Sequence, residues 1–207
     1  MELLRKTSMV LAVTMTIAFS VNAQTFEQVQ KAFKESYASE LKGDYNAAIA
    51  SLQKAYSADS YEDNLRMGWL HYSAKKYTSA MDYYQKAGEL KKFSVESRLG
   101  YITVANAAKQ YEKSYQKYEE ILKIDPYNSI ANYWVGVTYY TLKKYDVAAK
   151  YFELVVNMYP FDYDGNHMLG WTYLALGKTG EAKILFEKAL LNRPYDASAK
   201  EGLGKSK

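Results

Sequence analysis

The sequence predicts an all-α protein, a solenoid of about five stacked helix-turn-helix repeats with a short C-terminal capping helix. Three prolines, Pro126, Pro160 and Pro194, are spaced 34 residues apart. At a fixed distance before each proline, a small residue is followed four positions later by a large aromatic, as with Ala148 and Phe152. A constant period of this length is typical of repeat arrays, in which each unit packs mainly against its neighbours.

The composition fits a helical array and excludes several classes of protein. The 207 residues are 48% hydrophobic and 24% charged, which is ordinary for a globular domain. The net charge of +4, with no run of five Lys or Arg residues, gives no reason to expect nucleic acid as a partner. Because the chain has no cysteine, disulfides, thiolate metal sites, a cysteine nucleophile and an N-terminal lipid acceptor are all excluded.

The first 23 residues have the layout of a secretory signal peptide. Arg5 and Lys6 precede a mostly apolar stretch over 9–19, and small or short residues at 21–23 precede Gln24. A membrane anchor is the alternative, but a spanning helix needs about 20 apolar residues, and this run is little more than half as long. We therefore expect residues 1–23 to be cleaved and the domain over 24–207 to be exported, to the periplasm or beyond, with no stable membrane span.

The helical pattern divides the domain into repeats over 26–60, 61–92, 93–128, 129–162 and 163–196, with a cap over 197–204. Thr25 and Gln28 are spaced as a capping box that opens the first helix. Asp162 and Asp164 are typical of a helix start. A tyrosine opens the second helix of four repeats: Tyr45, Tyr77, Tyr111 and Tyr145.

A glycine recurs inside the first helices, although glycine there costs about 1 kcal/mol relative to alanine. We expect it to face the small residue of the second helix, so that the two backbones approach closely. In the third repeat this alignment requires two extra residues between Gly100 and Tyr111. The glycine follows an apolar residue in each case: Met67-Gly68, Leu99-Gly100, Val135-Gly136 and Leu169-Gly170.

These features together resemble the tetratricopeptide repeat family over about residues 26–194. The fifth repeat matches the family's spacing best, at Leu169, Gly170, Tyr173, Gly177, Ala182, Phe186, Ala189 and Pro194. The chain departs from the family where a tryptophan is usual, at Asn64, Glu96, Asn132 and Asn166. The resemblance implies a right-handed superhelix whose first helices line a concave groove for a protein partner, usually without a reaction centre.

Carrying the family's groove positions over to this sequence selects nine candidate partner-binding residues. Leu65, Trp69 and Tyr72 also share one helical face, distinct from the face of Gly68. The alternative is that this second face packs only between neighbouring repeats. Because these positions are mainly aromatic or aliphatic, we do not expect the Lys, Asn and Arg clamp with which some family members grip a terminal carboxylate. The nine are Leu65, Trp69, Tyr72, Tyr101, Tyr133, Val137, Tyr140, His167 and Trp171.

No arrangement of residues points to catalysis, to a metal or to a cofactor. His71 and His167, the only histidines, fall in different repeats, and no third ligand lies at a suitable spacing. We therefore expect an exported scaffold or adaptor of the cell envelope that holds a segment of another protein in an aromatic groove. The alternative is a structural protein whose homo-oligomer is the working form. An enzyme that uses the repeats as a platform is supported by no nucleophile, base or metal cluster.

Overall fold

The computed structural model describes residues 25–207, which form eleven helices and no strands. The expected signal peptide lies outside the described residues. The first helices of the repeats are α1 (Phe26–Glu40), α3 (Tyr61–Ser73), α5 (Val95–Ala107), α7 (Ser129–Thr141) and α9 (Tyr163–Ala175). The second helices are α2 (Tyr45–Gln53), α4 (Tyr77–Leu90), α6 (Tyr111–Ile124), α8 (Tyr145–Met158) and α10 (Thr179–Asn192), and α11 (Ala197–Lys205) follows.

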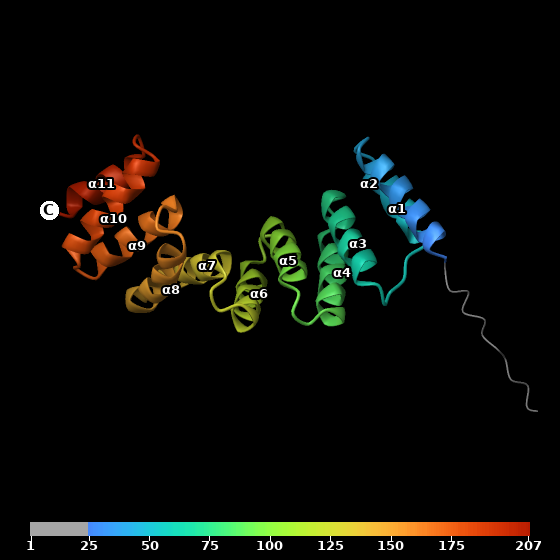
Figure 1. The fold of residues 1–207 in the computed structure, drawn as a ribbon, viewed down its shortest axis with the longest axis horizontal. Helices are drawn as coiled ribbons and strands as arrows, with labels where there is room; N and C mark the ends of the chain where they lie inside the picture. The colour runs from blue at the N-terminus through green and yellow to red at the C-terminus, as the bar shows by residue number, and fades with distance from the viewer. Residues whose placement is uncertain (1–24) are drawn as a thin grey trace, which may run out of the picture.

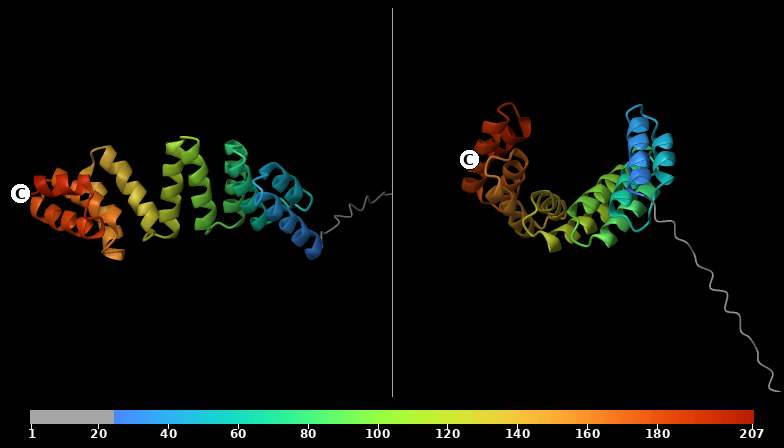
Figure 2. Two further views of the ribbon diagram at one scale, coloured as in Figure 1. Left: turned by 90° about the horizontal axis from the view of Figure 1, so that it is seen from above. Right: turned by 45° about the vertical axis from the view of Figure 1, so that its right-hand side comes forward.

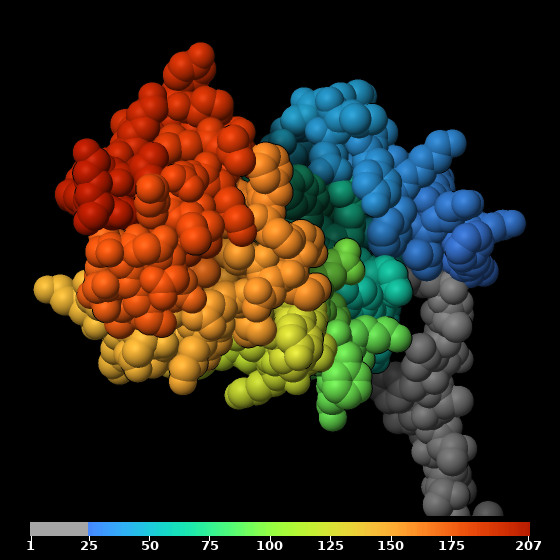
Figure 3. All heavy atoms as spheres, turned by 60° about the vertical axis from the view of Figure 1, so that its left-hand side comes forward, coloured from blue at the N-terminus to red at the C-terminus, as the bar shows by residue number. Residues whose placement is uncertain are grey.

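The helices stack in chain order, and each packs mainly against the helix before it and the helix after it (Figure 1). The stack curves, so that the N-terminal and C-terminal repeats form the two arms of an arch (Figure 2). In the space-filling view the two arms flank a recess, with atoms of the middle repeats at its base (Figure 3). The predicted all-α solenoid is confirmed. Within 25–207, no helix is both long enough and apolar enough to cross a bilayer.

Side-chain N-caps recur with the period of the array. From the second repeat on, the residue before each first helix accepts a hydrogen bond from the backbone N–H three residues later. Such a cap satisfies an amide that has no partner inside the helix. The predicted capping box of Thr25 and Gln28 is also confirmed. The caps, spaced 34 residues apart, are Ser60, Ser94, Asn128, Asp162 and Asp196.

The recurring glycines face aromatic rings rather than small residues. A Cβ atom built on Gly136 would lie 2.8 Å from a ring carbon of Phe152, and one on Gly170 would lie 3.0 Å from the ring of Phe186. The expected pairing of glycine with the small residue of the second helix is therefore wrong. The glycine makes room for the aromatic ring that follows the small residue by four positions on the second helix. Burial of that ring removes apolar surface from water and so stabilises the repeat.

The third repeat contains no inserted residues. Its first helix has 13 residues, the same as α3 and α7, and the turn residue Lys109 lies 34 residues after Lys75. Ile102 therefore stands at the position of Gly68, and Thr103 at that of Trp69. Gly100 has a different role, because a Cβ there would lie 2.3 Å from the ring of Tyr84 in the preceding repeat. The two-residue insertion expected after Gly100 was a register error.

Three buried asparagines stand where the resembled family has tryptophan. The side-chain amide of Asn132 donates to the backbone carbonyls of Pro126 and Asn128, both at 2.9 Å. Asn166 makes the equivalent bonds to Pro160 and Asp162, and Asn64 binds the corresponding loop. These bonds tie the loop before each first helix to the first turn of that helix. In the third repeat the equivalent residue is Arg98, not Glu96, and it donates to the carbonyl of Ser94.

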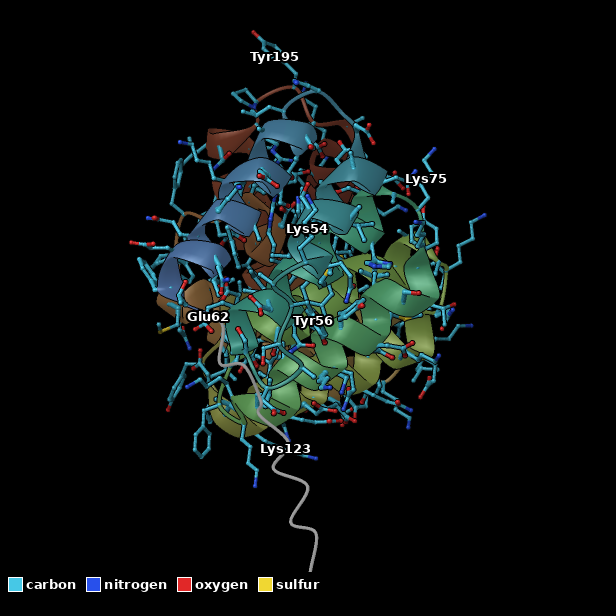
Figure 4. The ribbon with its side chains drawn as sticks, turned by 90° about the vertical axis from the view of Figure 1, so that its right-hand side faces the viewer. Lys54, Tyr56, Glu62, Lys75, Lys123 and Tyr195 are labelled. Atoms are coloured by element: carbon cyan, nitrogen blue, oxygen red, sulfur yellow. The ribbon has the colours of Figure 1, made fainter. Side chains whose placement is uncertain are left out.

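The turns inside the repeats need a left-handed residue. Lys75, Lys109 and Lys143 adopt φ angles of 59°, 57° and 58°, and Gly43 and Gly177 serve the same purpose. The left-handed conformation costs a non-glycine residue roughly 1–2 kcal/mol, so each of these three lysines lowers the stability of its turn relative to glycine. Lys75 points into solvent from the turn between α3 and α4 (Figure 4).

Candidate functional site

The candidate site begins with a hollow of about 580 Å³ among the first helices of the first three repeats. We call it the N-terminal hollow. Its surface is mainly aromatic and aliphatic, with two glutamates and one arginine. It is lined by Phe33 and Tyr37 from α1, by Glu62, Leu65, Arg66 and Trp69 from α3, by Tyr84 from α4, and by Glu96, Leu99, Gly100 and Thr103 from α5.

Trp69 is held at this hollow while much of its ring stays exposed. Its side chain is 43% exposed, and the indole Nε1 donates to the carboxylate of Glu40 on α1. An aromatic ring that is fixed but still exposed can anchor a partner with little further loss of side-chain freedom. The tryptophan predicted from the repeat register is therefore available to solvent.

Arg66 links the first two repeats beneath the hollow. Its Nη2 lies 2.6 Å from a carboxylate oxygen of Glu40, and its guanidinium lies 3.8 Å from the centre of the Tyr37 ring. Burial alone would raise the pKa of Glu40, but the hydrogen bonds from Arg66 and Trp69 outweigh it and hold that pKa below its usual range. The carboxylate therefore stays ionised and neutralises the arginine.

The other two predicted residues of the second repeat pack partly in the core. Leu65 contacts the cluster of Met81 and Tyr84, and Tyr72 packs in the same cluster, with its ring 6.2 Å from that of Tyr77. The geometry of Tyr72 therefore fits the alternative hypothesis, in which the side chain packs within the array, better than an open groove.

Tyr101 lies away from the N-terminal hollow. It faces a smaller pocket, of about 260 Å³, between α4, α5 and α6, where the Nζ atom of Lys117 lies 5.1 Å from the centre of its ring. The corrected register explains this placement. The position equivalent to Trp69 is Thr103, which does line the hollow.

A second hollow, of about 680 Å³, opens between the third and fourth repeats. We call it the central hollow. Trp134 lies in its wall, is 44% exposed and stacks on Tyr118 at 6.4 Å. Val137 is the one predicted residue that lines it. The lining is Asn106, Tyr111, Ser114, Tyr115, Tyr118, Trp134, Val137, Thr138, Thr141 and Leu142.

Trp134 was not among the predicted residues, although the sequence contained a signal for it. Trp134, Val137, Thr138 and Thr141 follow the spacing of one helical face. Tyr133, which was predicted, packs instead against Phe152, with ring centres 5.9 Å apart, and lines a smaller pocket with Trp134. Tyr140 packs against Tyr145 at 5.3 Å.

His167 and Trp171 hold the C-terminal cap. The Nε2 atom of His167 lies 2.8 Å from Ser198 Oγ on α11, and Trp171 Nε1 lies 3.1 Å from both atoms. A Cβ on Gly202 of α11 would lie 2.2 Å from the Phe186 ring, so only glycine allows this close contact. Helix α11 of the same chain therefore already contacts both of these predicted groove residues.

The cap contact predicts a pH dependence of stability. Trp171 Nε1 can only donate, so His167 Nε2 accepts and the imidazole is neutral. Burial lowers the pKa of His167, with Asp196 and Asp164 opposing the shift and Arg193 adding to it. In the unfolded chain the histidine pKa is about 6.5. As the pH falls, His167 is therefore protonated in the unfolded chain at a higher pH than in the folded one. Stability is therefore complete above that pH and is lost as the pH falls below it, by at most about 1.4 kcal/mol per pH unit.

Urea unfolding between pH 7.5 and pH 5 measures this loss, with His167→Gln expected to reduce it. Burial and Lys76 also lower the pKa of His71, so His71→Gln is the matched variant that removes the other contribution. If wild type and His167→Gln lose stability equally on acidification, the role given to His167 is wrong.

The described part of the chain contains no group of three or more His, Asp or Glu residues placed to hold a metal ion. What the two hollows offer is exposed aromatic surface on a rigid helical frame, which suits recognition of another protein. The helix pairs, their period of 34 residues and the glycine–aromatic contacts together point to one family.

Sequence profiles described as tetratricopeptide repeats match residues 33–61, 64–90, 104–163 and 163–196. The chain belongs to the tetratricopeptide repeat family. Tetratricopeptide repeat proteins bind protein partners and are typically non-catalytic scaffolds. No curated protein matches this chain.

Solved tetratricopeptide repeat structures share the fold at low sequence identity. A tetratricopeptide repeat protein from Parabacteroides merdae is 19% identical, with a TM-score of 0.71 over 87% of this chain and 72% of its own. A MamA protein is 20% identical, with a TM-score of 0.65 over 80% of this chain and 92% of its own. MamA from Desulfovibrio magneticus is 18% identical, with a TM-score of 0.64 over 83% of this chain and 98% of its own.

Proposed function

We propose that this tetratricopeptide repeat protein is an adaptor that holds a segment of a protein partner in the N-terminal and central hollows. The observation that supports this most strongly is the exposure of Trp69 and Trp134, each at the wall of a hollow lined mainly by aromatic and aliphatic side chains. Large aromatic residues contribute disproportionately to binding energy at protein interfaces. In the array, neither ring is needed to fill the core of a repeat.

We further propose that the adaptor works outside the cytoplasm, in the periplasm or beyond, after cleavage of residues 1–23. The supporting feature is the basic, apolar and small-residue layout of the leader. N-terminal sequencing of the protein isolated from its native cell tests this, and an N-terminus at Gln24 is expected. Recovery of the intact leader would contradict it.

Site-specific photo-crosslinking in the native cell tests the adaptor function. A photoreactive residue at Thr103, which lines the N-terminal hollow, is expected to capture a partner that the same residue at Tyr195 does not. Tyr195, in the loop before α11, projects into solvent (Figure 4) and does not line the hollow. Equal capture from both positions would argue against a groove partner.

Affinity for the captured partner then tests the two tryptophans. Trp69→Ala is expected to weaken binding about 30-fold, corresponding to about 2 kcal/mol, and Trp134→Ala is expected to act in the same direction. Phe93→Ala is the matched control, because Phe93 is 83% exposed and lines neither hollow. Trp134 is a better probe than Tyr133, whose truncation would also disturb Phe152. Unchanged affinity in both tryptophan variants would rule the hollows out.

Self-association as the working form receives less support. The face of α11 that points away from the array is polar, with Lys200, Glu201 and Lys205 exposed. A polar outer face on a terminal helix is what keeps the end of a solenoid from stacking on another copy. Light scattering at high protein concentration is expected to show a monomer.

A further inference from the structure

Two carboxylates stand at the N-terminal hollow without a cationic partner. Glu62 and Glu96 line it from the first turns of α3 and α5, and both are exposed. Glu96 accepts a hydrogen bond from Tyr61 Oη at 2.8 Å, and Glu62 accepts a long one from Ser60 Oγ at 3.4 Å. Among the described residues, neither carboxylate takes part in an ion pair.

The hollow is therefore locally acidic in a chain of net positive charge. Its one cationic lining residue, Arg66, is 9% exposed and is neutralised by Glu40. Glu62 lies on the opposite side of the array from Lys75, at the other end of α3 (Figure 4). The full chain has a net charge of +4, so the negative charge at the hollow is a local feature and does not follow from the overall composition.

The two carboxylates share the hollow with apolar side chains. The side chains of Leu65 and Trp69 on α3 and of Leu99 on α5 lie in the same hollow as the two glutamates. The central hollow provides a contrast, because its lining contains aromatic, aliphatic, hydroxyl and amide side chains but no charged one. The combination of carboxylates with aromatic and aliphatic side chains therefore distinguishes the N-terminal hollow from the central hollow.

Helix stability by itself explains only part of this arrangement. A carboxylate in the first turn interacts favourably with the helix dipole wherever the helix lies. Glu112 in α6 and Glu181 in α10 have this first-turn position too, and neither lines a hollow. These two residues therefore provide matched controls for the charge of Glu62 and Glu96.

We propose that the N-terminal hollow binds an extended partner segment in which Lys or Arg residues flank an aromatic or branched aliphatic residue. The cations would meet Glu62 and Glu96, and the apolar side chain would lie against Leu65 and Leu99 and extend along α3 towards Trp69. Neighbouring helices lie about 10 Å apart and an extended chain rises about 3.3 Å per residue, so the two cations are spaced about three residues apart. This inference rests on the proposed function and specifies the chemistry of the partner.

Selection from a randomised library of twelve-residue peptides displayed on phage tests the proposal with the full-length protein. Peptides are selected on wild type and then synthesised, and their affinities are measured by fluorescence anisotropy. The comparison proteins are Glu62→Gln/Glu96→Gln, the control Glu112→Gln/Glu181→Gln, and Trp69→Ala. Circular dichroism on all four establishes that their helix content is the same.

Enriched peptides are expected to combine Lys or Arg with an aromatic or branched residue. Their affinity is expected to fall about 3- to 30-fold in Glu62→Gln/Glu96→Gln and to stay unchanged in the control. Raising the salt concentration is expected to weaken binding to wild type and to remove most of this difference.

The outcomes separate this inference from the proposed function. Enrichment of neutral or acidic peptides, or equal binding to Glu62→Gln/Glu96→Gln, overturns the charge preference. If those peptides still lose affinity for Trp69→Ala, the hollow remains a binding site of another specificity. If no selected peptide distinguishes wild type from Trp69→Ala, both the inference and the role of this hollow fall.

Discussion

Replacing Phe152 with alanine is expected to lower the free energy of unfolding by about 3–5 kcal/mol. The ring is fully buried and lies between Gly136 of its own repeat and Leu169 and Leu185 of the next. Alanine would remove the contacts of the ring and leave a cavity that rigid helices on both sides cannot close. The loss is therefore as large as a single core substitution usually produces.

Urea unfolding followed by circular dichroism measures this effect. Because repeats in an array are stabilised by their neighbours, the C-terminal repeats are expected to unfold before the N-terminal ones in Phe152→Ala. Phe161→Ala, at an exposed aromatic nine residues further on, is expected to change stability by less than about 0.5 kcal/mol. Similar unfolding midpoints for the two variants would show that the ring of Phe152 is not a central packing element.

Replacing Arg66 with methionine is expected to cost about 2–3 kcal/mol and to loosen the first repeat. The substitution leaves Glu40 without its ion pair and Ser36 without its hydrogen bond, and it removes the cation from the Tyr37 ring. Breaking a fully buried pair typically costs 3–5 kcal/mol. The expected cost here is lower because the Glu40 side chain remains 21% exposed and water can solvate it.

Hydrogen exchange localises this loss, with α1 and α2 expected to exchange faster than the rest of the array. Arg98→Met is the comparison variant, because the Arg98–Glu120 pair at 3.0 Å is more exposed and should contribute no more than about 1 kcal/mol. The Ser94 carbonyl, which also loses its bond from Arg98, keeps one from Ser97 Oγ. In the double variant Arg66→Met/Glu40→Leu, stability should be largely restored, since no unpaired charge remains. No difference between Arg66→Met and Arg98→Met would refute the proposed link between the first two repeats.

The residues that line the hollows were harder to predict than the fold, and the third repeat shows why. Leu99-Gly100 matches the local pattern of the other first helices, so a register based on that pattern selected Tyr101. The structure places Thr103 at the equivalent position, because Gly100 gives room to Tyr84 from the preceding repeat. The sequence contains no local sign of which neighbouring ring a glycine accommodates.

His167, Trp171 and Trp134 show the same limit in another form. Two of these aromatic residues occupy groove positions of the family, yet α11 folds over them through Ser198. Trp134 was missed because its neighbour Tyr133 occupies the family position, although the latter ring turns towards Phe152. Whether a side chain on a helix is open or covered depends on the size and position of residues on other helices.

The sequence by itself determined the repeat period, the paired helices, the buried aromatic in the second helix of repeats two to five, and the family. These depend on spacing along one chain, because helical geometry fixes which residues share a face. Only the tertiary structure decided which of the aromatic residues remain exposed, where the two hollows open and that Glu62 and Glu96 line the same one. Those features arise where neighbouring repeats fit together, and the fit depends on side-chain volumes brought close by folding.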